Sequence, residues 1–180
     1  MYGKFITVLI VFCFCVASVE GQAPYLFGQF NMQGNTVPDP ANPTGCYRLT
    51  AEQSNNLGTI WTQSTIDLNC NFTLPFNLYF GDNGADGMCF VIQNTSNTYL
   101  GPTVSGGGGL GYLGLWNSFA IEFDTWFNVE KSDVYENHVS IQTKGLEPNE
   151  SHHRSKTAIT TSIPLLQDGN IHAVRIRYES

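Results

Sequence analysis

The sequence is poor in basic residues, with 8 Lys and Arg against 15 Asp and Glu and a formal net charge of −7. Charged residues of both signs make up only 13% of the chain. Proteins that bind nucleic acid or anionic membranes usually carry a basic patch, and no cluster of Lys and Arg is present here. The composition therefore argues against nucleic acid and anionic lipid as partners.

The chain also lacks an apolar run long enough to span a bilayer comfortably. Its apolar segment Phe5–Ala17 follows Lys4 and precedes the small residues of Val19-Glu20-Gly21. A basic start, an apolar core of this length and small residues at the cleavage point are typical of a secretory signal. We expect residues 1–21 to be a signal peptide, with an uncleaved anchor as the alternative, and the secreted chain to begin near Gln22.

Cysteine is scarce beyond the predicted signal, where only Cys46, Cys70 and Cys89 remain. In an oxidising compartment two of them should pair. We favour a Cys46–Cys70 disulfide because both flank the early strands, and we interpret Cys89, which lies among apolar residues, as a buried thiol. Sequons at Asn71, Asn94 and Asn149 fit a secreted glycoprotein, although such short motifs also occur by chance.

A long helical period and an internal repeat are both missing. Instead the chain has 18 glycines and 13% aromatic residues, a profile typical of a turn-rich β protein. Its 180 residues are enough for one domain. Short apolar runs between turns predict the strands Tyr25–Phe30, Cys46–Leu49, Gly58–Trp61, Phe72–Phe80, Gly87–Gln93, Phe119–Trp126, His138–Thr143, Thr157–Ile163 and Ile171–Tyr178. Many short, evenly spaced strands predict an all-β sandwich or jelly roll.

The most informative stretch begins in the middle of the chain. Polar and aromatic residues occupy every second position there: Glu122, Asp124, Trp126 and Asn128. In a strand they share one face, while Ile121 and Phe123 point the other way, toward a core. Crowded carboxylates repel each other unless a cation lies between them. Asp133 and His138 follow soon after, so the set suits calcium together with manganese or a similar ion. The alternative is an ordinary solvated strand face with a structural histidine.

A glycine-rich segment, Gly106–Gly114, precedes this stretch. Glycine lets backbone N–H groups approach a ligand closely. No Gly-Lys-Ser/Thr follows and no helix opens, so a phosphate-binding loop is excluded. A flexible linker is the alternative, and the strands predicted on both sides of the segment weaken it.

Four blocks in this order resemble the L-type lectin family of legume seed lectins and their secreted relatives: Gly84–Met88, Gly111–Gly114, Ile121–Asn128 and Asn137–Ile141. The resemblance covers roughly Gln22–Ser180 and implies a concanavalin A-like jelly-roll β-sandwich. The link between the second and third blocks is shorter than in the legume pattern. The family domain usually continues past Val174–Tyr178, so we expect this domain to be incomplete at its C-terminus.

The resemblance implies two neighbouring ions. A transition ion, usually Mn²⁺, would bind Glu122, Asp124, Asp133 and His138. Ca²⁺ would bind Asp124, Asp133, the Asn128 side chain and the Trp126 carbonyl. In this family the ions shape the sugar-binding loops without touching the sugar. Ligand deprotonation is required for metal binding, so we expect binding to weaken at low pH.

The implied sugar contacts come from Asp86, Trp126, Asn128 and a backbone N–H of Gly111 or Gly109. Asp86 would accept hydrogen bonds from two hydroxyls, and Trp126 would stack on the apolar face of a pyranose. The family also holds the peptide equivalent to Ala85–Asp86 in the cis form. The polar cluster His152 to Arg154 is interpreted as solvated surface, with a metal or partner role as the alternative.

Two other functions compete with a lectin. Related sandwich folds carry β-glucan hydrolases, which need paired carboxylates flanking the scissile bond. Glu122 and Asp124 begin such a pattern, but Trp126 and Phe127 follow and Glu130 is out of register. The other alternative is an adhesion module without sugar affinity. We expect a non-catalytic carbohydrate-binding protein whose partners are glycans or glycoproteins, without nucleic acid or membrane insertion; a homo-oligomer is compatible with the sequence.

Overall fold

A computed structural model describes residues 6–7, 30–40, 46–51, 53–54, 56–100 and 107–180. The predicted all-β fold is confirmed, since these residues form antiparallel strands and two short 3-10 helices and contain no α-helix. The elements are β1 (Ile6–Thr7), β2 (Phe30–Gly34), β3 (Val37–Pro38), β4 (Tyr47–Arg48), β5 (Gly58–Thr62), β6 (Phe72–Tyr79), β7 (Gly87–Gln93), β8 (Ser118–Asp124), η3 (Val129–Lys131), β9 (His138–Thr143), η4 (His153–Ser155), β10 (Lys156–Thr160) and β11 (Ile171–Tyr178). No helix in the described part of the chain is long and apolar enough to cross a membrane.

The predicted strands agree closely with the observed ones. The bounds of β7, β9 and β11 are the predicted bounds, and β4, β5, β6, β8 and β10 differ only at their ends. The predicted strand Tyr25–Phe30 lies outside the described residues except for Phe30, which begins β2. Strand β1, which pairs with β7, falls within the predicted signal peptide. The signal peptide itself stays a prediction.

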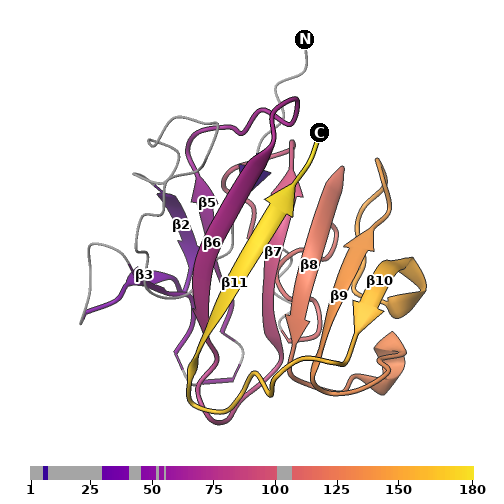
Figure 1. Cartoon of the computed structure of the whole chain (residues 1–180). Helices are drawn as coiled ribbons and strands as arrows, with labels where there is room; N and C mark the ends of the chain where they lie inside the picture. Colours follow the sequence, from indigo (N-terminus) through magenta and orange to yellow (C-terminus); the bar gives the residue numbers. More distant parts are fainter. Residues whose placement is uncertain (1–5, 8–29, 41–45, 52, 55, 101–106) are drawn as a thin grey trace.

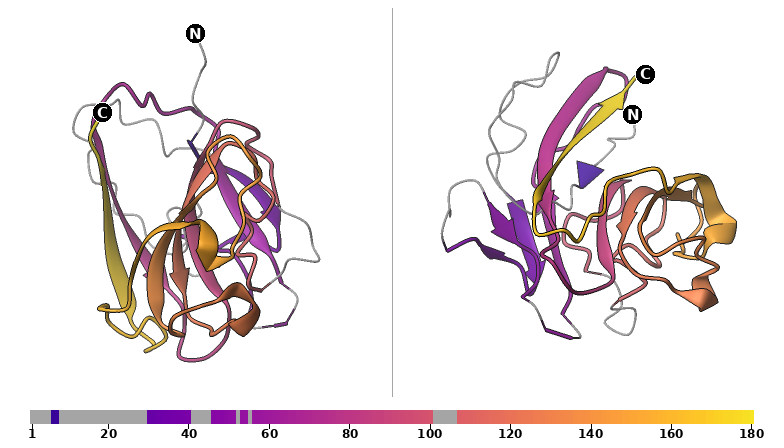
Figure 2. Two further views of the ribbon diagram at one scale, coloured as in Figure 1. Left: turned by 90° about the vertical axis from the view of Figure 1, so that its right-hand side faces the viewer. Right: turned by 60° about the horizontal axis from the view of Figure 1, so that its bottom comes forward.

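The strands form the two layers of a sandwich (Figures 1 and 2). One layer is a five-stranded sheet in the order β1-β7-β8-β9-β10, and the other contains the antiparallel pair β6 and β11. The layers meet where Phe76 of β6 stacks on Phe90 of β7, with ring centroids 6.1 Å apart and planes 12° from parallel. On β6 the buried residues alternate along the strand, which is the period of a strand with one face in the core.

Strand β8 buries the face that the sequence pattern assigned away from the core. Glu122 is 1% exposed and Asp124 is 4% exposed, whereas Ile121 on the other face is only partly buried. The carboxylate face is covered because side chains from two loops pack over it. Tyr112 donates its hydroxyl hydrogen to Glu122, and Asn149 donates to Ser118 Oγ at 3.1 Å. A solvated acidic face is therefore the wrong interpretation, and the alternation shows only which residues share a face.

The predicted Cys46–Cys70 disulfide is wrong. Cys70 is an exposed free thiol in the turn before β6, and Cys46 is 2% exposed in the core. A disulfide needs the two Cβ atoms within about 4.5 Å, which the sequence positions alone do not establish. The interpretation of Cys89 as a buried thiol is confirmed, and its Sγ donates to the carbonyl of Leu110 at 3.0 Å.

The three sequons differ in their accessibility. Asn149 is 1% exposed, and its Nδ2 donates to Ser118 Oγ at 3.1 Å and to the carbonyl of Gln142 at 3.2 Å. A glycan would have to be attached to this same buried nitrogen. Asn71 is exposed. We expect glycopeptide mass spectrometry of the chain from a eukaryotic secretory host to show a glycan at Asn71 and none at Asn149; an occupied Asn149 would contradict this packing.

Candidate metal centre and adjoining groove

The register between β8 and β9 assembles the first part of the site. Asp124 lies opposite His138 and Glu122 lies opposite Ser140, so these side chains project from one face of the sheet. His138 donates from Nδ1 to the carbonyl of Tyr135 over 2.6 Å. Because that nitrogen carries the hydrogen, the Nε2 atom of the neutral ring is an electron-pair donor facing the carboxylates.

A turn after β8 supplies Asp133. Its Oδ2 accepts the backbone N–H of Asn128 at 2.5 Å, and Ser132 before it adopts a left-handed conformation with φ of 60°. The structure thus brings the four predicted transition-ion residues together: Glu122, Asp124, Asp133 and His138. Together with His153, these residues form two overlapping groups. One contains Asp124, Asp133 and His138, and the other contains Glu122, His138 and His153. Within each group the ligand atoms lie within 4.8 Å of one another.

His153 is a member of the site that the sequence pattern did not identify. The interpretation of its cluster as solvated surface is wrong at this residue, which is 2% exposed because η4 turns its side chain into the protein. Its Nε2 lies 3.1 Å from Nε2 of His138 and 3.6 Å from Oδ1 of Asp133. Arg154, by contrast, is exposed. Nothing in the local sequence indicates that His153, and not His152, is the histidine buried in the metal centre.

Glu122 is held by hydrogen bonds from several elements. Its Oε2 accepts from Ser140 Oγ at 2.5 Å and from Gln142 Nε2 at 3.0 Å, while Tyr112 donates to Oε1. Burial by itself would raise the pKa of Glu122, but the nearby His153 and hydrogen bonds from Ser140, Tyr112 and Gln142 outweigh it and lower the pKa. Glu122 is therefore kept as a carboxylate inside the protein, in the form that binds a cation.

For Asp124, the effects that raise the pKa outweigh the one that lowers it. Burial raises its pKa to about 8, and the nearby charges of Asp133, Glu122 and Asp86 push in the same direction against one hydrogen bond from the backbone of Trp126. Two carboxylates that cannot both be charged comfortably in a dry site are stabilised by a bound cation. The electrostatics of the site therefore favour occupation by metal.

The donor set fits two kinds of ion. Carboxylate and amide oxygens suit Ca²⁺, and carboxylates with imidazole suit a transition ion. Asn128 adds a specific observation, because its Oδ1 is buried and has no hydrogen-bond partner. A buried carbonyl oxygen without a partner costs free energy unless another group satisfies it. A calcium ion beside Asn128, Asp124 and Asp133 would supply that partner.

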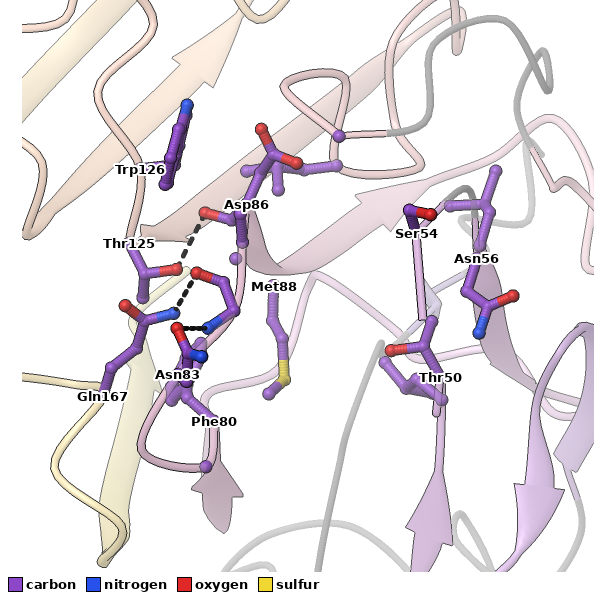
Figure 3. A pocket seen from close by; sticks show the side chains of 18 of the residues that line it. Thr50, Ser54, Asn56, Phe80, Asn83, Asp86, Met88, Thr125, Trp126 and Gln167 are labelled. Atoms are coloured by element: carbon purple, nitrogen blue, oxygen red, sulfur yellow. Dashed lines mark hydrogen bonds between the residues drawn. The ribbon is translucent and has the colours of Figure 1, made fainter. Parts of the chain in front are cut away.

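A groove of about 1020 Å³ adjoins this centre, and Figure 3 shows part of its wall. Asp86 and Trp126 lie on one side, and Thr50, Ser54 and Asn56 lie on the other. Asn128 also lines the groove. Trp126 is 52% exposed, so a large part of its ring is available to a ligand. The groove thus combines a carboxylate, an amide and an exposed indole at one end.

The loop that carries Asp86 is fixed from two sides. The peptide bond Ala85–Asp86 is cis, as the resemblance implied. The carbonyl of Asp86 accepts from the N–H of Thr125 at 2.8 Å and from its Oγ1 at 3.0 Å. Gln167 donates from Nε2 to the carbonyl of Gly84 at 2.7 Å (Figure 3). Thr125 and Gln167 are positioning residues that the sequence pattern did not identify, since they act on backbone atoms of a distant loop.

The glycines beside the groove are not the ones expected from the resemblance. Gly107 and Gly108 line the groove, whereas Gly109 and Gly111 are buried and do not line it. Gly107 has φ of 79°, and a Cβ there would lie 2.7 Å from Oδ2 of Asp86. Glycine at position 107 is therefore required both by the backbone conformation and by the close approach to Asp86.

The fold and site together are a β-sandwich with a buried carboxylate–imidazole centre, next to a groove walled by an acidic side chain and an exposed indole. The family model described as the legume lectin beta-barrel domain matches residues 22–180. The chain therefore belongs to the L-type lectin family, whose domains bind carbohydrate and are generally not catalytic.

Proposed function

We propose that this chain is a secreted, non-catalytic lectin whose glycan groove is organised by Ca²⁺ and a transition ion. One observation carries the proposal: the same residues hold the metal centre and the groove. Asp124 accepts the backbone N–H of Trp126 at 2.8 Å, and Asp133 accepts that of Asn128 at 2.5 Å. Trp126 and Asn128 both line the groove. Any ion that fixes the two carboxylates also fixes the two groove residues.

Each side chain then has a distinct role. Glu122, Asp124, Asp133 and His138 would hold the transition ion, and Asp124, Asp133, Asn128 and the Trp126 carbonyl would hold Ca²⁺. Asp86 accepts hydrogen bonds from sugar hydroxyls, and Trp126 packs on an apolar sugar face. Gly107 and Gly108, rather than Gly109 or Gly111, would bring backbone groups to the sugar because they line the groove.

The site does not favour a hydrolase. Glu122 and Asp124 are 1% and 4% exposed, and Glu122 does not line the groove. Hydrolysis of a glycosidic bond requires carboxyl groups on both sides of a bound sugar linkage. An adhesion module without sugar affinity is the remaining alternative, and it predicts ion binding with no glycan binding.

A glycan array run on the secreted chain with Ca²⁺ and Mn²⁺, and again with excess chelator, tests the proposal. We expect a defined set of glycans to bind in the presence of the ions and to be lost with chelator. Circular dichroism on each sample establishes that the chain is folded. A folded, ion-loaded chain that binds no glycan would contradict the proposal and favour the adhesion module.

A further inference from the structure

We propose that His153 is a second imidazole ligand of the transition-ion site, and that this ligand makes the site selective for Zn²⁺ over Mn²⁺. The inference rests on the proposed function for the existence of a transition-ion site, and it extends that function by naming a further ligand and the preferred ion. The rings of His138 and His153 meet edge to face, with centroids 4.8 Å apart and planes at 89°.

The distances around His153 suit coordination of a single ion. Its Nε2 lies 3.1 Å from Nε2 of His138, 3.6 Å from Oδ1 of Asp133 and 3.7 Å from Oε2 of Glu122. Ligand atoms about 2.0–2.2 Å from one zinc ion in a tetrahedral arrangement are about 3.4 Å from one another. The three distances from this nitrogen lie around that spacing. Glu122, His138 and His153 form one group whose ligand atoms all lie within 4.8 Å of one another, so one ion can contact these three residues together.

Hydrogen bonds hold the turn that carries His153. Arg154 donates from Nε to Oε1 of Glu150 at 3.0 Å and from a second nitrogen to Oε2 at 3.1 Å, and Ser155 donates to Oε1 at 2.5 Å. Lys156 donates from Nζ to the carbonyl of His153 at 3.1 Å. These contacts fix the η4 turn, so metal binding does not have to order the backbone that carries His153.

The second imidazole changes which ion the site prefers. Carboxylates and water suit Mn²⁺, whereas imidazole suits Zn²⁺ and the other late transition ions. The proposed ligands Glu122, Asp124, Asp133 and His138 supply one imidazole among three carboxylates. Adding His153 gives a second imidazole, and its group with Glu122 and His138 has the two-histidine, one-glutamate donor set found in zinc sites.

A hydrogen bond between the rings is the competing explanation for the 3.1 Å contact. His153 would then donate from Nε2 to the electron pair of His138 Nε2, and it would contribute nothing to the ion. The two explanations differ in the number of imidazoles bound to metal, two against one.

X-ray absorption at the zinc edge on the metal-stripped, zinc-reloaded full chain counts these imidazoles directly. We expect two imidazoles per zinc in the wild type and one in His153→Gln. Competition between Zn²⁺ and Mn²⁺, followed by mass spectrometry of the bound ion, should show the zinc preference falling by about tenfold or more in His153→Gln. The matched control His172→Gln, at a half-buried histidine on β11 that pairs with Asp168, should keep both the count and the preference.

Failure of this inference is distinguishable from failure of the proposed function. One imidazole per zinc in the wild type, or no bound zinc, would overturn the role of His153, and the wild-type measurement stands even if the variant does not fold. Glycan binding by the same zinc-loaded sample is measured in parallel. Two imidazoles with no glycan binding would sink the lectin proposal alone, and glycan binding with one imidazole would sink only the role of His153.

Discussion

Replacing Asp86 with asparagine should lower glycan affinity by at least about 100-fold, because the substitution removes a charged acceptor of two sugar hydroxyl bonds. Asn and Asp have nearly the same shape, so the groove beside Gly107 keeps its form. The carbonyl of Asp86, which Thr125 holds, is unaffected by the side-chain change. The measurement is titration of the best array glycan against wild type and Asp86→Asn in saturating Ca²⁺ and transition ion.

The control variant removes one negative charge from an exposed carboxylate outside the groove. Glu147 is exposed in the turn after β9, at the opposite end of that strand from His138. Glu147→Gln should bind the glycan within about threefold of the wild type, as is usual for an isolated surface change. Bound metal and melting temperature should be the same in all three proteins. Undiminished glycan binding by Asp86→Asn would place the sugar away from this groove.

Removing the ions should destabilise the protein by an amount that grows with pH. Ions present at about 100 times their dissociation constants add about 2.7 kcal/mol each, so stripping them should lower the melting temperature by several degrees. Without metal, the raised pKa of Asp124, about 8 against an ordinary 3.8, means that the folded chain holds a proton that the unfolded chain has lost. This contribution to stability is complete below the ordinary pKa and disappears as pH rises through about 8.

The comparison is best made between pH 6.5 and 8.5. Burial lowers the pKa of His138, so its ring is largely neutral above 6.5 and adds little in this range. Bound metal keeps Asp124 as a carboxylate, so the metal-loaded protein does not lose this contribution to stability as pH rises. The melting-temperature difference between loaded and metal-stripped protein should therefore widen at the higher pH. A metal-stripped Asp124→Asn variant should lack this dependence; an equal difference at both pH values in the wild type would refute the mechanism.

Much of the fold could be predicted from the alternation of apolar residues. Strands β7, β9 and β11 begin and end where the pattern predicts, because side chains alternate between the faces of a strand over every two residues. In β11, Val174 and Ile176 are partly buried while Ile171 is exposed, as the same alternation indicates. Local pattern is informative here because it depends only on neighbouring residues.

The candidate site was predictable only where its residues lie on one strand or follow a motif. Glu122, Asp124, Asp133 and His138 meet as the resemblance implied, since the β8–β9 register aligns Glu122, Asp124 and His138 and the turn after β8 supplies Asp133. His153 could not be found in this way because a separate turn carries it into the centre. Which glycines line the groove could not be read from a run of glycines whose members look alike.

The interpretations that failed needed knowledge of tertiary packing. The carboxylate face of β8 is buried because Tyr112 and Asn149 cover it from loops far from each other in the sequence. The Cys46–Cys70 pairing was inferred from sequence position, although Cys70 lies in an exposed turn. In both cases the sequence identified the chemistry of the side chains, and the packing of distant segments decided their surroundings.

In the proposed mechanism, metal ions organise the glycan groove through Asp124 and Asp133. The most direct measurement titrates Ca²⁺ and Zn²⁺ into metal-stripped protein while native mass spectrometry counts the bound ions and glycan binding is followed in the same samples. We predict that glycan affinity appears as the chain reaches two bound ions and is absent from the metal-free chain. Full glycan affinity in protein that carries no ion would contradict the account.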